Sequence, residues 1–335
     1  MDTGPDSDLD LRKQIAADAA EPEETPTIFV RAGQFFVVPL AIVTACLGVY
    51  LFFRYMVTEP HAPKDLISEI RTGGAVGRKH ASHQLVQVVL EQAKRDKLDP
   101  ALFDPLLTVF RELPANESPS DPITRGLVGE GPSMRAVLAR CLSFYRDPRA
   151  VDPILEAMKA ERNSETLAAY LDALGGIRAP EAAPALIKLL DHESTIVRKY
   201  AAFNLAAVAA PRKREGGEAP AVPEARPHLQ RKLLDERPEV RWNAALGLAV
   251  FLGDPSGKEV LLQMLDRAHL ERLIGTDKKE ENGAKLVAHA MTMACQAAAA
   301  LKDDAFQPAL KRAEADPDSD VRAAARMAMG TLAKR

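Results

Sequence analysis

Residues 179–209 of this chain of 335 residues have the sequence APEAAPALIKLLDHESTIVRKYAAFNLAAVA. The stretch predicts two short helices joined by a polar turn. The apolar residues of its first half are Ala183, Leu186, Ile187 and Leu190. Their spacing of three and four suits one buried face of a helix and not a strand. Residues 191–195 contain the Asp, Ser and Thr side chains that cap helix starts. The second helix would bury Ala201 and Leu205, which lie one turn apart.

The second helix carries a motif, Arg-x-x-Ala-x-x-x-Leu, that returns along the chain. The further copies are Arg78-Ala81-Leu85, Arg241-Ala244-Leu248 and Arg322-Ala325-Met329, with Arg135-Leu138-Leu142 as a looser one. A helix pair repeated every roughly thirty to forty-five residues is typical of an α-solenoid. These residues resemble HEAT repeats, particularly the short kind found in phycobilisome-lyase-like proteins. The resemblance covers the chain from about Asp65 onward, and it implies the fold while implying little about function.

We therefore expect an all-α fold, an α-solenoid of HEAT-like helix pairs preceded by one transmembrane helix. The expected domains are an acidic disordered tail (1–31), a transmembrane helix (32–56), a linker (57–64) and the solenoid (65–335), with insertions near 210–223 and 267–284. The tail is predicted to be disordered because acidic residues and prolines leave it little apolar surface to bury.

The expected transmembrane helix rests on residues 32–53, AGQFFVVPLAIVTACLGVYLFF, which contain no charged residue. A helix of that length crosses a hydrocarbon core of about 30 Å. A buried core helix is the alternative interpretation. A span followed by helix pairs resembles membrane-anchored HEAT-repeat proteins of bacteria, which implies a single-pass protein of the inner membrane.

The orientation follows from the basic residues that flank the span. Only Arg31 lies close before it, whereas several basic residues follow, namely Arg54, Lys64, Arg71, Arg78 and Lys79. Because positive residues stay inside, we expect a cytoplasmic C-terminal domain. The opposite topology, with the solenoid outside the cytoplasm, remains open.

The composition and the absence of known catalytic motifs in the sequence argue against an enzyme. The net charge of −3 gives no global field for nucleic acid. The three cysteines lie far apart, without the spacing of a disulfide framework or zinc site. We find no glycine-rich phosphate loop, nucleophile elbow or metal-binding helix. We therefore expect no catalytic activity, no cofactor, no metal and no small-molecule substrate. The resemblance to phycobilisome-lyase repeats leaves a bilin-lyase-like enzyme as a remote alternative.

The repeated arginines, Arg78, Arg198, Arg241 and Arg322, suggest either phosphate binding or a structural ladder. The HEAT resemblance implies the ladder, in which each arginine bonds acidic or carbonyl groups at the turn of the neighbouring repeat. The expected acidic residues are Asp191, Glu193, Glu239 and Asp320.

The predicted partner surface lies on the second helices, which normally line the concave face of a solenoid. Side chains just after each repeat arginine would face away from the core. The candidates are Lys199, Tyr200, Trp242 and Asn243, and a looser alignment of the repeats adds Tyr170 and His289. Trp and Tyr are favoured anchors at interfaces, although a lone Trp can also pack under a loop. We therefore expect a membrane-tethered scaffold that docks a protein. An accessory or assembly subunit of a membrane complex is the alternative.

Overall fold

The computed structural model describes residues 38–57, 62–113, 133–211, 213–214, 217–218, 222–274 and 280–334. The predicted acidic tail and residues 32–37 of the predicted span lie outside them. The chain divides into two units, Met1–His61 and Ala62–Arg335.

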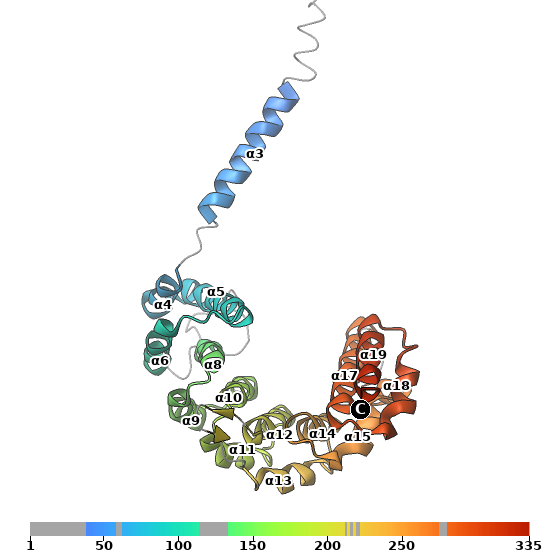
Figure 1. Cartoon of the computed structure of the whole chain (residues 1–335). Helices are drawn as coiled ribbons and strands as arrows, with labels where there is room; N and C mark the ends of the chain where they lie inside the picture. Colours follow the sequence, from blue (N-terminus) through green and yellow to red (C-terminus); the bar gives the residue numbers. More distant parts are fainter. Residues whose placement is uncertain are drawn as a thin grey trace, which may run out of the picture. The chain divides into compact units, whose positions relative to one another are not determined.

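The described helix of the first unit is α3 (Val38–Val57; Figure 1), and its described side chains, 39–52, are all exposed. Among the described residues, no helix has both the length and the apolar character that a membrane crossing needs. The prediction of a transmembrane helix over residues 32–56 is therefore not confirmed.

The second unit consists of helix pairs that follow one another in chain order (Figure 1). The first helices of the pairs are α4 (Pro63–Thr72), α6 (Phe103–Glu112), α9 (Val151–Ala160), α11 (Ala183–Leu189), α13 (Ala225–Lys232), α15 (Lys258–Met264) and α18 (Gln307–Ala313). The second helices are α5 (Ala75–Lys94), α8 (Met134–Tyr145), α10 (Ser164–Ile177), α12 (Thr195–Ala209), α14 (Pro238–Leu252), α17 (Glu280–Leu301) and α19 (Ser319–Leu332). The predicted all-α solenoid is confirmed.

The second helices form one layer, which we call the inner layer. Helices α8, α10, α12 and α14 pack side by side in that order, whereas the first helices make few contacts with one another. Each first helix packs instead on the second helix of its own pair, as α11 does on α12. The inner layer therefore holds successive pairs together.

Most first helices begin with a short 3₁₀ turn capped by an aspartate. These turns are η2 (Pro100–Leu102), η3 (Pro148–Ala150), η5 (Pro255–Gly257) and η6 (Asp304–Phe306). The carboxylates of Asp99, Asp147, Asp254 and Asp303 each accept a hydrogen bond from the backbone N–H two residues later, at 2.8–3.0 Å. The equivalent turn η4 (Pro180–Ala182) begins after Ala179 and has no such cap. An aspartate before the turn therefore marks most repeat starts.

Two predicted insertions differ in character. The segment near 210–223 contains a short antiparallel hairpin, β1 (Lys213–Arg214) and β2 (Gly217–Glu218). The segment near 267–284 contains α16 (Arg267–Ile274), an extra helix between the two helices of the α15–α17 pair, and the first turn of α17. Leu270 on α16 is fully buried in the core, which fixes this helix to the repeat.

Small residues allow the inner helices to approach closely. A Cβ atom on Gly175 of α10 would overlap the side chain of Asn204 on α12, and one on Gly247 of α14 would lie 2.7 Å from the Cβ of Ala206. Asn204 is itself buried and donates to the carbonyl of Tyr200 at 3.0 Å. The contact between α10 and α12 therefore requires glycine at position 175.

We expect Gly175→Ala to lower the free energy of unfolding by about 1–3 kcal/mol, because the added methyl group must displace Asn204. The matched control is Gly330→Ala in α19, where nothing lies within 4 Å of the new Cβ. That change should be neutral or stabilising by about 0.4–1 kcal/mol. Urea unfolding followed by circular dichroism measures both, and equal effects of the two substitutions would contradict the close approach.

Candidate functional site

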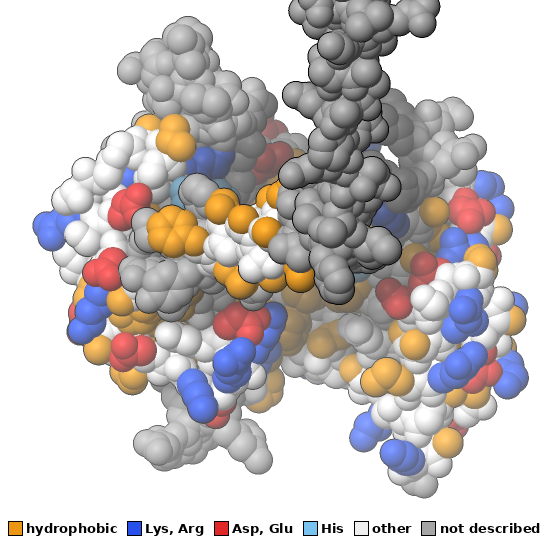
Figure 2. All heavy atoms as spheres, turned by 90° about the horizontal axis from the view of Figure 1, so that it is seen from above, with side chains coloured by type: hydrophobic (Ala, Val, Ile, Leu, Met, Phe, Trp, Pro, Cys, Tyr) orange, Lys and Arg blue, Asp and Glu red, His pale blue; other side chains and the backbone are white. Residues whose placement is uncertain are grey.

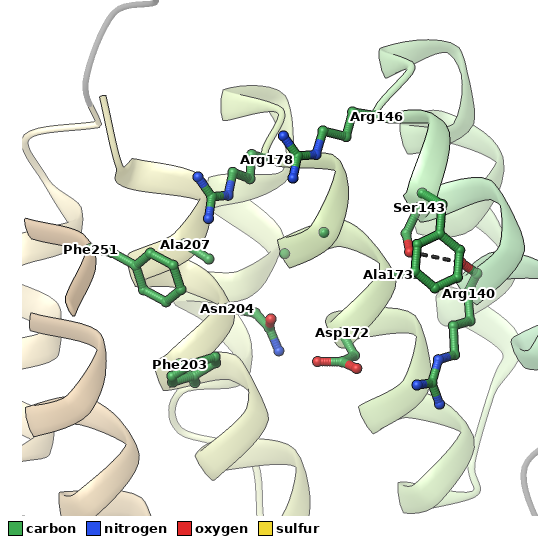
Figure 3. A pocket seen from close by; sticks show the side chains of 13 residues that line it. Arg140, Ser143, Arg146, Asp172, Ala173, Arg178, Phe203, Asn204, Ala207 and Phe251 are labelled. Atoms are coloured by element: carbon green, nitrogen blue, oxygen red, sulfur yellow. Dashed lines mark hydrogen bonds between the residues drawn. The ribbon is translucent and has the colours of Figure 1, made fainter. Parts of the chain in front are cut away.

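Two adjoining hollows lie on the inner layer, where α8, α10 and α12 pack together. The first has a volume of about 300 Å³ and also reaches the end of α14 (Figure 3). Its polar and aromatic lining consists of Arg140, Ser143, Phe144, Arg146, Asp172, Arg178, Phe203, Asn204 and Phe251. The second has a volume of about 370 Å³. Its lining includes Arg140, Glu165, Asp172, Ile196, Lys199 and Tyr200.

Arg140 and Asp172 line both hollows, and we call this shared boundary the ridge. Although Asp172 reaches solvent, the protein around it displaces enough water to raise the pKa of its carboxyl. The positive charge of Arg140 and a hydrogen bond with Asn204 oppose that rise. The ridge therefore carries an electrostatically coupled pair from neighbouring helices.

Aromatic rings and cations stack along the walls. The guanidinium of Arg178 lies 5.2 Å from the ring centroid of Phe251, and the ammonium of Lys199 lies 5.4 Å from that of Tyr200. The rings of Phe203 and Phe251 meet edge to face, with centroids 5.2 Å apart. Such contacts hold long side chains in one orientation and leave part of each ring accessible.

The predicted partner residues differ in how they are placed. Lys199 and Tyr200 line the second hollow and are half-buried. Trp242 and Asn243 are half-buried on α14, the next inner helix, where Trp242 packs against the core and Asn243 donates to the Glu239 carbonyl at 2.8 Å. His289 is exposed on α17.

Tyr170 was wrongly predicted as a partner residue. Only 1% of its surface is exposed, and its ring meets that of Phe110 edge to face in the core. The looser repeat alignment at α10 misplaced its register, since Asp172, two residues later, is the residue that faces the hollows. Sequence reasoning also missed Arg140, Arg146 and Arg178.

The repeat arginine Arg198 joins two successive turns. Its Nη1 donates to the carbonyls of His192 and Glu193 at 3.0 and 2.9 Å, within its own turn. Its Nε and Nη2 contact the two carboxylate oxygens of Asp235 at 3.2 Å, and Nη2 also contacts Glu236. The side chains of Arg198 and Asp235 are only 9% and 6% exposed. This buried pair therefore ties one repeat to the next.

Two other repeat arginines make the same bonds to their own turns. Arg241 donates to the carbonyls of Asp235 and Glu236, and Arg322 donates to those of Asp316 and Pro317, at 2.7–3.1 Å. The expected acidic residues were wrong in detail: Asp191 instead pairs with Lys232 and Glu239 with Arg237, while Asp235 and Asp316 receive the guanidinium groups. Arg78 is half-buried near the start of α5.

Helix α16 supplies an arginine that sequence reasoning did not include in the ladder. Arg267 contacts both carboxylate oxygens of Asp316, at 2.6 and 2.8 Å, as Arg198 contacts Asp235. The hydrogen bond to Asp316 raises the pKa of the Arg267 guanidinium. A signal was available, because Asp235 and Asp316 each lie six residues before a repeat arginine.

On the face shown in Figure 2, cationic and anionic side chains lie interspersed. Among the described residues, no group of three or more His, Cys, Asp or Glu side chains could hold a metal ion. What the described site offers is a pair of hollows with aromatic walls and charges of both signs, which suits noncovalent recognition.

This architecture defines a helical-repeat protein of the α-solenoid class. A family model described as HEAT repeats matches residues 121–206 and 184–274, so this part of the chain is similar to HEAT repeats.

Solved structures show similarity at a low level. The complex of CpcE and CpcF of phycocyanin lyase from Nostoc sp. PCC7120 is 20% identical, with 82% of this chain and 94% of that chain covered and a TM-score of 0.49. YibA of E. coli is 16% identical, with 81% and 92% covered and a TM-score of 0.40. Human deoxyhypusine hydroxylase in complex with glycerol is 19% identical, with 78% and 100% covered and a TM-score of 0.26. No curated protein matches the chain. These similarities carry no argument about function.

We expect Arg198→Met to lower the free energy of unfolding at pH 7 by about 3 kcal/mol, because it leaves the buried Asp235 carboxylate without its main cation. The matched control is Arg237→Met, which removes an exposed pair with Glu239 and should cost less than about 1 kcal/mol. Chemical unfolding at pH 7 measures both variants, and equal losses would contradict the ladder.

At acid pH we expect a smaller difference in the free energy of unfolding between the wild type and Arg198→Met. Burial acts to raise the pKa of Asp235, but the backbone N–H of Arg237 and the Arg198 guanidinium outweigh it, so the pKa is lowered. A lowered folded-state pKa stabilises the protein above the unfolded value of about 3.9, and that stability is lost as the pH falls through the folded value. A difference that stays constant to well below about pH 4 would show that the carboxylate is not the group lost.

Proposed function

We propose that this chain is a non-catalytic scaffold whose inner layer docks a protein partner. The observation that carries the proposal is the pair of hollows built from three successive inner helices, α8, α10 and α12. Their walls combine partly exposed aromatic rings with charged groups, as hot spots of protein interfaces do.

The shape of the site favours a macromolecule over a small ligand. Helical-repeat stacks offer extended surfaces on which a partner contacts several repeats at once. Small-molecule pockets are mostly apolar with few polar groups, whereas these hollows carry Arg140, Glu165, Asp172 and Lys199 along their length. Charges of both signs select a partner by their arrangement more than they add affinity.

Trp242 and Asn243 extend the proposed surface to the next repeat. Helix α14 packs beside α12, so these residues continue the layer that carries Lys199 and Tyr200. A half-buried tryptophan has a ring that is already oriented by the core, and little side-chain entropy is lost when a partner covers the rest of it.

We test the docking surface by placing a photo-crosslinking amino acid at Tyr200 or, as a matched control, at Lys188. Lys188 is exposed on α11, a first helix of the same repeat. We expect a discrete crosslinked product from Tyr200 in intact cells and none from Lys188. Loss of the Tyr200 product on Lys199→Glu, with folding retained, would support the surface. Products from Lys188 alone would move the docking surface to the first helices.

We also propose that the apolar segment with α3 tethers the scaffold to a membrane, with the repeats in the cytoplasm. Two observations support this tether: residues 32–53 carry no charge, and α3 exposes apolar side chains such as Leu40, Val43 and Leu47. The finding that no described helix can cross a membrane stands against it. A tether would keep the docking surface near partners at the membrane.

We expect the full-length chain to stay in the membrane pellet after alkaline carbonate extraction. The double substitution Val43→Arg and Leu47→Arg should release it, because each arginine at the centre of a span costs about 2.5–3.5 kcal/mol. The control is Val76→Arg, an equally apolar and exposed position on α5. Release of the wild-type chain would refute the tether while leaving the docking surface untouched.

A further inference from the structure

Three of the helices that border the first hollow, α8, α10 and α14, are followed by a residue in the left-handed conformation. Arg146 after α8 and Arg178 after α10 adopt the left-handed conformation, with φ of 52° and 59°. The equivalent position after α14 is Gly253, with φ of 58°. Left-handed backbone is natural for glycine and unfavourable for a residue with a Cβ atom. Two arginines therefore occupy positions where glycine suits the backbone better, and both line the same hollow.

Both side chains are directed to one end of that hollow (Figure 3). The guanidinium of Arg178 lies over the ring of Phe251, and this stacking restricts its position. Arg146 is exposed, and its guanidinium has no hydrogen bond or ion pair with the residues that the structure describes. The carboxylate in the lining, Asp172, lies close enough to Arg140 to feel its charge. The lining of this hollow therefore contains three arginines, Arg140, Arg146 and Arg178, and one carboxylate.

Stabilisation of the helix ends explains only part of this arrangement. A cation at a helix C-terminus is favourable because the last carbonyls carry partial negative charge. That effect accounts for an arginine at each end, as it does for Lys302 after α17. It does not account for the convergence of two guanidinium groups on one hollow with a phenylalanine pair, Phe203 and Phe251, in its wall.

We propose that Arg146 and Arg178 bind a carboxylate of an acidic segment in the partner protein, and that the next apolar side chain of that segment packs against Phe203 and Phe251. This inference rests on the proposed docking function and names the chemistry of what docks. A guanidinium offers paired N–H donors that match the two oxygens of a carboxylate. Because Arg178 is already held by its stacking, binding orders one side chain fewer.

The path of the segment from the first hollow to the second would cross the ridge, the boundary that the two hollows share. Beyond the two arginines the segment reaches Arg140 and then Lys199 and Tyr200 in the second hollow. Further acidic residues of the segment would meet Arg140 and Lys199, and basic residues would meet Asp172 and Glu165. The partial negative charge of the helix ends opposes an anion, so both arginines are needed to hold it.

The test measures binding of a short fluorescein-labelled peptide of alternating Glu and Leu to the full-length chain. The binding is monitored by the fluorescence anisotropy of the peptide. The same peptide with Gln in place of Glu is the matched ligand. We expect the Glu peptide to bind, with an affinity that falls as salt is added, and the Gln peptide to bind roughly tenfold more weakly or not at all. Equal binding of the two peptides would overturn the proposal.

Arg146→Gln should weaken binding of the Glu peptide by roughly tenfold. Because Arg146 is exposed and makes no bond with the described residues, its loss leaves folding intact. The double variant with Arg178→Gln should abolish binding. Arg162→Gln, an exposed arginine in the turn before α10, is the matched control and should bind as the wild type does. Unchanged binding by Arg146→Gln would overturn the assignment.

Inorganic phosphate and pyrophosphate serve as competitors that separate a carboxylate site from a phosphate site. We expect millimolar concentrations of either to compete no better than chloride at equal ionic strength. Displacement at low phosphate concentration, together with weak peptide binding, would replace the acidic segment with a phosphorylated ligand. A crosslinked partner at Tyr200 combined with no peptide binding would reject this inference and leave the docking function standing.

Discussion

The structure depends on how closely the inner helices approach one another. Gly175 faces Asn204, Gly247 faces Ala206, and no Cβ fits at either glycine without movement. Most buried positions of the stack are alanine or leucine, and a few large rings such as Tyr170, Phe110 and Phe306 complete the core. Because the helices lie so close together, an added methyl group at either glycine would overpack the contact.

Close packing of the inner layer also creates the hollows. Where the facing residues are as small as Ala173 and Gly176, the space beside them is not filled by the core, and it opens toward the solvent between longer side chains. The charged residues then stand on the rims as Arg140, Asp172 and Lys199 do. The close packing and the hollows therefore share one cause, because the small residues that allow the helices to touch also leave space beside them.

The sequence predicted the helix pairs well, because the three-and-four spacing of apolar residues and the repeated arginine motif are local signals. It did not identify the helix α16 within the predicted insertion, because most of that helix is polar and Leu270 is its buried residue. It also failed at Tyr170, since a shift of two residues turns a helical position from the surface to the core. Lys199 and Tyr200 line the second hollow, and their place on the accessible side of α12 could be predicted because the Arg198 motif sets the register of that helix. Arg146 and Arg178 were missed because left-handed helix ends are a property of the backbone that residue type does not reveal.

The arginine ladder shows why a repeat motif alone predicts bonds incompletely. The carbonyl acceptors of Arg198, Arg241 and Arg322 lie five and six residues earlier, so the motif's own helix start determines them. The carboxylate acceptors depend instead on the neighbouring repeat. Asp235 receives a guanidinium from the preceding repeat, while Asp316 receives one from α16. The aspartate at this turn also accepts a hydrogen bond from the backbone N–H two residues later, which orients its carboxylate independently of the arginine. Both turns therefore share an aspartate that pairs with an arginine. The arginine comes from the preceding repeat at Asp235 and from α16 at Asp316.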